Sequence, residues 1–143
     1  MKILVINGPN LNLLGTREPE FYGTMTLDDI NFELIEYSKT LSSDIELEFF
    51  QSNFEGDIVE KIQKTDAKGI IINPAAYTHT SIAIADSIRA VKVKTVEVHL
   101  SNIQSREYYR KTSYVSSVSM GTISGFKQNG YKMALFALYN ELK

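Results

Sequence analysis

A glutamate and a histidine lie two residues apart in a short segment that alternates apolar and polar residues. Glu97 and His99 would point to the same face of a β-strand, because successive side chains on a strand alternate between its faces. A carboxylate in that position can orient the imidazole and sustain its protonated form, so the pair could act as a general acid. Two unrelated polar residues at a strand end would show the same spacing, and that alternative stays open.

A tyrosine and an arginine share a long segment without helical or strand periodicity. Arg17 and Tyr22 lie within residues 11–25, where glycines and a proline interrupt every period. Loops of this length are often lids. A guanidinium favours the phenolate form of a nearby tyrosine, which could then remove a proton. Alternatively, Tyr22 is an ordinary tyrosine and Arg17 a solvated charge.

Other polar residues follow the apolar segments. Asn10 follows the first segment, Asn73 ends the third, and His79 lies beside hydroxyl residues that often begin helices. His79 could be a bystander to helix capping, or it could lie next to an anionic ligand at the free N–H groups of the helix N-terminus. The two interpretations are compatible.

Two arginines lie four residues apart in a polar stretch. Arg106 and Arg110 would share one face of a helix and could contact ligand hydroxyls, or they could be solvated, with Glu107 as an ion-pair partner. The nearby glycines are followed by no Gly-Lys-Ser/Thr and form no Gly-x-Gly-x-x-Gly motif, so nucleotide binding is not predicted.

These candidate residues need a scaffold that brings several strand ends together. The expected strands are residues 2–7, 45–50, 69–73, 94–99 and 118–124, and the expected helices begin at Thr26, before Ile58, at Ser81 and near Gly125. Their alternation predicts one domain, residues 1–143, with a three-layer flavodoxin-like α/β fold. Helices would cover both faces of a five-stranded parallel sheet of order 2-1-3-4-5. Ligands of such folds bind beyond the carboxyl ends of the strands, where the candidates converge.

The composition narrows the class of protein. A formal charge of −2 predicts no large basic surface for nucleic acid. The chain has no Cys, which excludes disulfides and thiolate chemistry and suits a reducing compartment. No apolar run approaches the roughly 20 residues that cross a bilayer, and no signal peptide is recognisable. We therefore expect a soluble, cytoplasmic protein that binds neither nucleic acid nor membrane.

Three longer motifs contain most of the candidate residues. The first is Ile-Asn-Gly-Pro-Asn-Leu-Asn-Leu-Leu-Gly at residues 6–15, followed by Arg17 and Tyr22-Gly23. The second is Asn-Pro-Ala-Ala-Tyr-Thr-His-Thr-Ser at residues 73–81, and the third is Glu-Val-His-Leu-Ser-Asn-Ile at residues 97–103. In sequence, order and spacing they resemble the signatures of the type II 3-dehydroquinase family, and the similarity extends from the first strand to the final helix.

The resemblance implies a lyase without cofactor or metal that dehydrates 3-dehydroquinate to 3-dehydroshikimate, the third step of chorismate biosynthesis in the shikimate pathway. It implies that Tyr22, as tyrosinate, removes a proton from C2, while Arg17 favours the ionised tyrosine and stabilises the transition state. Asn10 would stabilise the resulting enolate through a bound water. His99, oriented by Glu97, would protonate the departing C1 hydroxyl in an anti elimination.

The resemblance also implies how substrate and subunits are bound. The implied substrate-binding residues are Asn73 and the backbone of Leu100 and Ser101 for the carboxylate, His79 and Arg110 for ring hydroxyls, and, as a lesser candidate, Arg106. Asp86 is similar to the family's aspartate that reaches into a neighbouring subunit's site. This similarity implies a homo-oligomer, typically a dodecamer of four trimers.

The sequence departs from the family pattern in places. Ala75 and Lys127 stand where members often have Gly, and Gln104-Ser105 replaces a more usual His-Ala pair. None of these is an expected catalytic residue. Ala75 could nonetheless shift the Asn73 loop, so we expect a changed KM before a changed mechanism.

Two alternatives compete with this interpretation. A non-catalytic flavodoxin-like binding or signalling module, such as a receiver domain, would need carboxylates after the first strand and an Asp that ends the third. This chain has Asn7 and Asn73 there. The second alternative is a related hydro-lyase that acts on another cyclic hydroxy acid.

Overall fold

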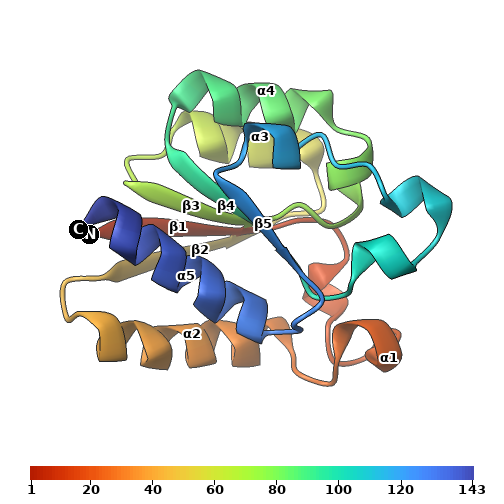
Figure 1. Cartoon of the computed structure of the whole chain (residues 1–143), viewed down its shortest axis with the longest axis horizontal. Coiled ribbons are helices and arrows are strands. Elements are labelled where there is room, and N and C mark those ends of the chain that lie inside the picture. Colours follow the sequence, from red (N-terminus) through yellow and green to blue (C-terminus); the bar gives the residue numbers. More distant parts are fainter.

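The computed structural model describes residues 1–143, in which a parallel β-sheet lies between two layers of helices (Figure 1). The strands are β1 (Lys2–Asn7), β2 (Glu46–Gln51), β3 (Gly69–Asn73), β4 (Lys94–His99) and β5 (Gly121–Ser124). Their order is β2-β1-β3-β4-β5, and each neighbouring pair is parallel. The predicted fold class and strand order are confirmed.

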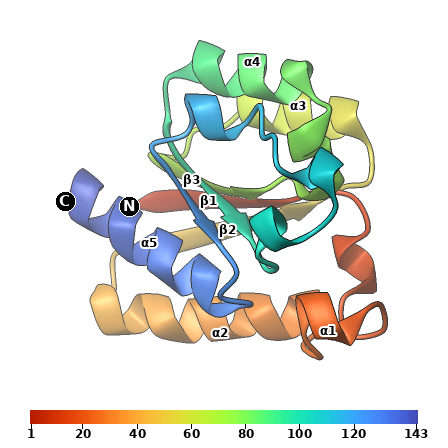
Figure 2. The ribbon, with the colours of Figure 1, turned by 45° about the vertical axis from the view of Figure 1, so that its right-hand side comes forward.

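Four longer helices form the outer layers. Helices α2 (Leu27–Leu41) and α5 (Asn129–Leu142) cover one face of the sheet, and α3 (Glu55–Gln63) and α4 (Ile82–Val91) cover the other (Figures 1 and 2). The short helix α1 (Pro19–Tyr22) lies near the carboxyl ends of the strands, whereas both chain termini lie at the opposite end (Figure 1). None of the helices is long and apolar enough to span a membrane.

The central strands are apolar because both of their faces are covered. Ile3 and Val5 of β1 pack into the core formed with α2 and α5, whereas Leu4 and Ile6 pack into the core formed with α3 and α4. Full burial of a side chain of this size contributes about 1.5–3 kcal/mol. Because packing fixes each central strand from both sides, the residues at its carboxyl end have a defined register.

Strand β4 places polar residues where β1 and β3 have only apolar ones. Val96 and Val98 belong to the core with α2 and α5, and the intervening Glu97 and His99 therefore point to the opposite face. Glu97 is paired in register with residues of both neighbouring strands, β3 and β5. The strand thus carries Glu97 and His99 inside the protein, at the carboxyl end of the sheet.

The helix starts follow the predicted capping signals. The Thr26 hydroxyl accepts a hydrogen bond from the Asp29 N–H at 3.1 Å, and the Asp29 carboxylate accepts one from the Thr26 N–H. At the start of α4, Ser81 accepts a hydrogen bond from the N–H of Ile84. Such caps typically contribute about 1 kcal/mol each.

The boundaries differ most from the predicted ones in three segments, and β2 is shifted by one residue, to 46–51 instead of 45–50. Residues 11–25 contain the 3₁₀ turn η1 (Leu11–Leu13) and α1, because Pro19 suits the first turn of a helix and Gly23, with φ of 84°, ends it. Strand β5 begins at 121 instead of 118, after the turn η5 (Ser116–Val118). Helix α5 begins at 129 because residues 125–128 form a turn with Gly125 and Lys127 at positive φ.

Candidate active site

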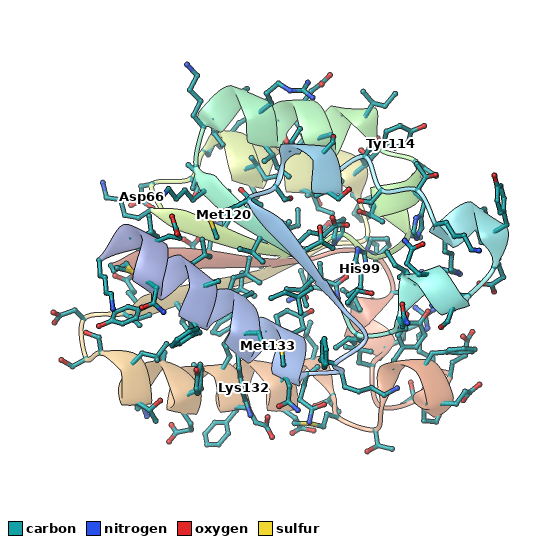
Figure 3. The ribbon with its side chains drawn as sticks, in the orientation of Figure 1. Asp66, His99, Tyr114, Met120, Lys132 and Met133 are labelled. Carbon is teal, nitrogen blue, oxygen red and sulfur yellow. The ribbon has the colours of Figure 1, made fainter.

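The proposed acid pair lies at the carboxyl end of β4. His99 Nε2 donates a hydrogen bond to Glu97 Oε1 at 2.6 Å, and Figure 3 shows His99 at this end of the sheet. The fully buried Glu97 carboxylate also accepts hydrogen bonds from the hydroxyls of Thr78, Ser113 and Thr122. The structure therefore brings Glu97 and His99 together as their spacing predicted.

The surroundings of Glu97 keep it ionised. Burial by itself would raise the pKa of Glu97, but the hydrogen bond and charge of His99, with the Thr78 and Ser113 hydroxyls, outweigh burial and hold this pKa below its ordinary value. An ionised carboxylate keeps a proton on the His99 nitrogen that faces it and fixes the ring orientation. The other ring nitrogen of His99 is left for a ligand in the adjacent cavity.

His79 lies beside His99. It ends the turn η2 (Ala75–His79), so it precedes α4 and does not belong to its first turn. Its Nδ1 donates to the Thr112 carbonyl at 2.7 Å, and its ring stacks on that of His99 with centroids 6.4 Å apart. Burial lowers the pKa of His79, the Thr112 carbonyl opposes this, and the positive charges of His99 and Arg110 lower it further. A neutral His79 leaves Nε2 as an acceptor for a ligand hydroxyl.

Two arginines contact the tyrosine of α1. Arg17 Nη2 and Arg106 Nη1 donate to the Tyr22 hydroxyl at 3.2 and 2.9 Å, and the Arg17 guanidinium lies over the Tyr22 ring, 4.5 Å from its centroid. The structure therefore brings Arg17 and Tyr22 together and adds Arg106, the lesser candidate from the sequence, as a second guanidinium at the same phenolic oxygen.

Arg106 is more buried than Arg110. Only 5% of its side chain is exposed, compared with 20% for Arg110. Arg106 also donates to the Ser101 hydroxyl at 3.3 Å, and its guanidinium lies 4.4 Å from the centroid of the Phe21 ring. This position makes Arg106 a bridge between the helix that carries the tyrosine and the segment after β4.

Arg106 and Arg110 do not share one helix face, contrary to the sequence-based expectation. Arg106 follows the turn η3 (Ile103–Ser105), and Arg110 ends the turn η4 (Tyr108–Arg110). Glu107 lies between them and accepts a hydrogen bond from Arg110 Nε at 2.8 Å, so the alternative ion pair does form. Both arginines still line the same cavity. The ion-pair interpretation and the ligand-contact interpretation are therefore compatible.

Two asparagines complete the polar lining at the ends of β1 and β3. Asn10 adopts a left-handed conformation with φ of 68°, which Asn tolerates better than most residues. Asn73 donates through Nδ2 to the Tyr131 hydroxyl at 3.0 Å and accepts through Oδ1 from the Ala75 N–H at 3.1 Å. Tyr131 in turn donates to Asn7 Oδ1. Burial raises the pKa of Tyr131, which stays neutral and fixes the Asn73 amide, and Asn73 keeps one amide hydrogen for a ligand.

A single cavity gathers nearly all of the predicted residues. Those that line it are Asn10, Arg17, Tyr22, Asn73, His79, His99, Leu100, Ser101, Arg106 and Arg110. Glu97 lies beneath it, behind His99. The cavity therefore joins the ends of β1, β3 and β4 to the lid segment, residues 11–25, as expected for an open parallel sheet.

Asp86 is not part of this cavity. It lies on α4 with an exposed side chain and forms an ion pair with Arg89 at 2.9 Å. No group of three or more His, Cys, Asp or Glu side chains is arranged to hold a metal ion. The polar groups that the cavity offers are three guanidinium groups, two imidazoles, amides and a phenol.

Four supporting residues escaped the sequence-based prediction. Thr78, Ser113 and Thr122 surround Glu97, and Tyr131 holds Asn73. Thr78 lies in the second motif, which was a usable signal. The other three lie far from their partners in the chain, and hydroxyl residues are too common for their types alone to reveal the contacts.

Comparisons with known proteins identify the family of the chain. Residues 1–139 match the family model described as Dehydroquinase class II. The chain is 54% identical over 140 residues to 3-dehydroquinate dehydratase of Francisella tularensis subsp. novicida, covering 98% of this chain and 95% of the relative. The crystal structure of type II dehydroquinase from Butyrivibrio crossotus superposes with a TM-score of 0.92 at 46% identity, over 96% of this chain and 97% of the other. The enzyme from Propionibacterium acnes gives a TM-score of 0.90 at 44% identity, over 97% and 96% of the two chains. The chain belongs to the class II dehydroquinase family.

Proposed function

We propose that Tyr22 is the base and His99 the acid in the reaction that this chain catalyses, the dehydration of 3-dehydroquinate to 3-dehydroshikimate in the shikimate pathway. Family membership supports the reaction. The observation that carries the assignment of roles is that one cavity is lined both by a tyrosine with two guanidinium groups at its oxygen and by a histidine on a buried carboxylate. An elimination next to a ketone needs a base and an acid of these kinds.

The first step breaks a C–H bond. Tyr22, as phenolate, takes a proton from C2 of the substrate, and the electron pair moves to the ketone oxygen to give an enolate. Arg17 and Arg106 offset the negative charge on the phenolate before transfer. Asn10, through a bound water, would stabilise the enolate oxygen.

The second step expels water. The enolate electrons return to form the new carbon–carbon double bond, the C1–O bond breaks, and His99 gives its proton to the departing hydroxyl. Glu97 offsets the positive charge of His99 before transfer. Solvent resets both residues, because the proton gained by Tyr22 balances the one lost by His99. In an anti elimination the base and acid act from opposite faces of the ring, which suits groups that come from separate segments of the fold.

Substrate binding follows from the remaining lining residues. Asn73, with the backbone of Leu100 and Ser101, would hold the carboxylate, and the neutral His79 and the cationic Arg110 would hold ring hydroxyls. Residues 11–25 would act as a lid, since they carry Tyr22 and can exclude water when closed. No cofactor or metal enters this scheme.

The assembly and location are further parts of the proposal. The family resemblance implies a homododecamer of four trimers in which Asp86, exposed on α4, reaches a neighbouring subunit's site. Sedimentation of the purified protein would test the assembly, and Asp86→Ala with an unchanged KM would argue against the contact. A cytoplasmic location also stays a prediction, which cell fractionation would test.

A direct assay tests the reaction. Purified protein mixed with 3-dehydroquinate, without added cofactor or metal, should produce the absorbance of the conjugated enone. A chelator, and borohydride added with substrate, should leave the rate unchanged, and inactivation by borohydride would indicate an imine mechanism instead. Absence of turnover would favour a binding module. Turnover of a different cyclic hydroxy acid alone would favour the related hydro-lyase.

A further inference from the structure

We propose that Lys127 is a positioning residue that holds α1 closed over the active site, an inference that rests on the proposed role of Tyr22 as the base. Lys127 Nζ donates to the carbonyl oxygens of Glu20 and Phe21 at 3.1 and 2.9 Å. These are the two residues that immediately precede Tyr22. The ammonium group is therefore hydrogen-bonded to the short helix that carries the Tyr22 hydroxyl.

The backbone of Lys127 is hydrogen-bonded to the segment that carries the proposed acid, His99. Its backbone N–H donates to the Leu100 carbonyl at 3.0 Å, and the N–H of Gly125 donates to the His99 carbonyl at 3.2 Å. The turn of residues 125–128, which follows β5 in the chain, is thus hydrogen-bonded to the end of β4. A single side chain spans from the segment that carries the proposed acid to the segment that carries the proposed base.

The contact also supplies what a short helix lacks. The last carbonyls of a helix have no partner within it, and a basic side chain near that end satisfies them and interacts favourably with the helix dipole. Helix α1 has only four residues, too few to be stable from its own hydrogen bonds. Contacts from outside the helix therefore determine where Tyr22 lies, and Lys127 makes two of them.

The backbone conformation of Lys127 is unfavourable for most residues other than Gly, so the lysine side chain is present despite backbone strain. Its φ is 52°, which is a left-handed conformation. Gly adopts this conformation without penalty, whereas it is unfavourable for a residue with a Cβ. A Gly at this position would relieve the strain but could not reach α1. Strain kept together with a contact that only a long basic side chain can make points to a role at the site.

The test compares three variants of Lys127 by kcat/KM for 3-dehydroquinate and by the rate of chymotrypsin cleavage after Phe21 and Tyr22, followed by the mass of the N-terminal fragment. Lys127→Met removes the donor and keeps the length of the side chain. We expect kcat/KM to fall about 3- to 10-fold, as for the loss of one or two exposed hydrogen bonds, and lid cleavage to accelerate by a similar factor. Lys127→Arg restores the donor and should return both values to within about twofold of the parent.

Lys127→Gly separates positioning from stability. It removes the strain and the donor together, so the Tm should rise while kcat/KM falls as in Lys127→Met. The matched control is Lys92, an exposed lysine at the end of α4 with φ of 57°. Lys92→Gly should raise the Tm in the same way and leave kcat/KM and lid cleavage unchanged.

Unchanged kcat/KM and lid cleavage in Lys127→Met, or an Arg variant no better than the Met variant, would overturn the proposal. Failure of the proposed function gives a different pattern. If Tyr22→Phe kept full activity, Tyr22 would not be the base, yet faster lid cleavage in Lys127→Met would still show that Lys127 holds the lid. If Tyr22→Phe were inactive and lid cleavage did not respond to Lys127, only the positioning role would fail.

Discussion

The two halves of the candidate active site are built in opposite ways. His99 is buried at the end of a central strand, and its partner Glu97 is held there by three hydroxyl donors. Tyr22 lies on a four-residue helix, half-buried, next to a Phe21 side chain that is 37% exposed. The core of the protein therefore positions the acid, whereas contacts between surface segments position the base.

This difference suits a reaction that starts with substrate entry. Surface hydrogen bonds contribute little each and can open and close, while a buried charge pair must stay in place because exposing either member alone is costly. One half of the site can thus be ready before the substrate arrives, and the other can form over it. Variants on the base side should consequently lose activity with little loss of stability, whereas variants on the acid side should lose both.

The largest effect is expected from removing the acid or the base. Tyr22→Phe and His99→Ala should each lower kcat by roughly 10²–10⁴-fold, the range for general acid–base groups. They should differ in stability: Tyr22→Phe should leave the Tm nearly unchanged, whereas His99→Ala leaves the buried Glu97 with one partner fewer and should cost about 1–3 kcal/mol. Steady-state kinetics and thermal unfolding measure the two quantities. A large drop in Tm for Tyr22→Phe would show that the lid is not independent of the core.

A smaller loss of activity is expected at the arginine that joins the two sides. Arg106→Met removes a charged donor at 2.9 Å from the Tyr22 oxygen, an interaction of about 1.5–3 kcal/mol, so kcat/KM should fall about 10- to 100-fold. Lys64→Met, which removes an exposed cation paired with Glu60 on α3, is the control and should change kcat/KM little. Equal changes of kcat/KM in the two variants would show that Arg106 does not act on Tyr22 in the active site.

Acid titration should separate the buried carboxylate from those at the surface. The pKa of Glu97 is lower in the folded protein than in the unfolded chain, so its stabilising contribution is present above the unfolded pKa and is lost as the pH falls through the folded one. The free energy of unfolding should thus decline below about pH 4.5 more steeply in the parent than in Glu97→Gln.

Two other groups, His79 and Glu107, also contribute to the pH dependence of the free energy of unfolding. His79, whose folded pKa is depressed, adds an acid-side loss that begins below its unfolded pKa of about 6.5 and is shared by both proteins. Glu107→Gln removes an exposed carboxylate of lowered pKa and should change the acid limb less than Glu97→Gln. Chemical denaturation at several pH values measures these slopes. Parallel curves for the parent and Glu97→Gln would contradict the assigned role of the buried pair.

The same contrast explains what the sequence could predict. The acid side follows from local rules, because a strand period of two puts Glu97 and His99 on one face and parallel strands bring Asn73 to the same edge. The base side depends on a contact between distant segments, because Tyr22 and Arg106 are separated by 84 residues. Side-chain type and spacing carry no information on such a pair. The nearness of Arg17 to Tyr22 in the sequence suggested a base but left the alternative open, and the family motifs then favoured it.

Helix boundaries were missed for a related reason. The sequence pattern predicts one long loop interrupted by Pro19 and Gly23, but at the start and end of a four-residue helix they are the residues that such a helix favours. The positions that depart from the family pattern were more informative than expected. Both Ala75 and Lys127, which stand where Gly is usual, have positive φ. The family resemblance thus offered a signal for left-handed backbone that the sequence-based prediction did not use.

The smallest effect is expected at Ala75, on the acid side. Its φ is 52°, and restoring the usual residue with Ala75→Gly should stabilise the protein by about 1 kcal/mol, or raise the Tm by about 3 °C, because the left-handed conformation no longer crowds a Cβ. Ala76→Gly, one residue further on and not at positive φ, should instead destabilise by about 0.5–1 kcal/mol. Since the Ala75 N–H holds Asn73 Oδ1, the KM should shift by no more than about threefold while kcat stays constant, as expected where one neutral hydrogen bond is only loosened. A lower Tm for Ala75→Gly would mean that the Ala75 methyl group packs well enough to outweigh its backbone strain, and that the loop after β3 is held by more than the Asn73 amide.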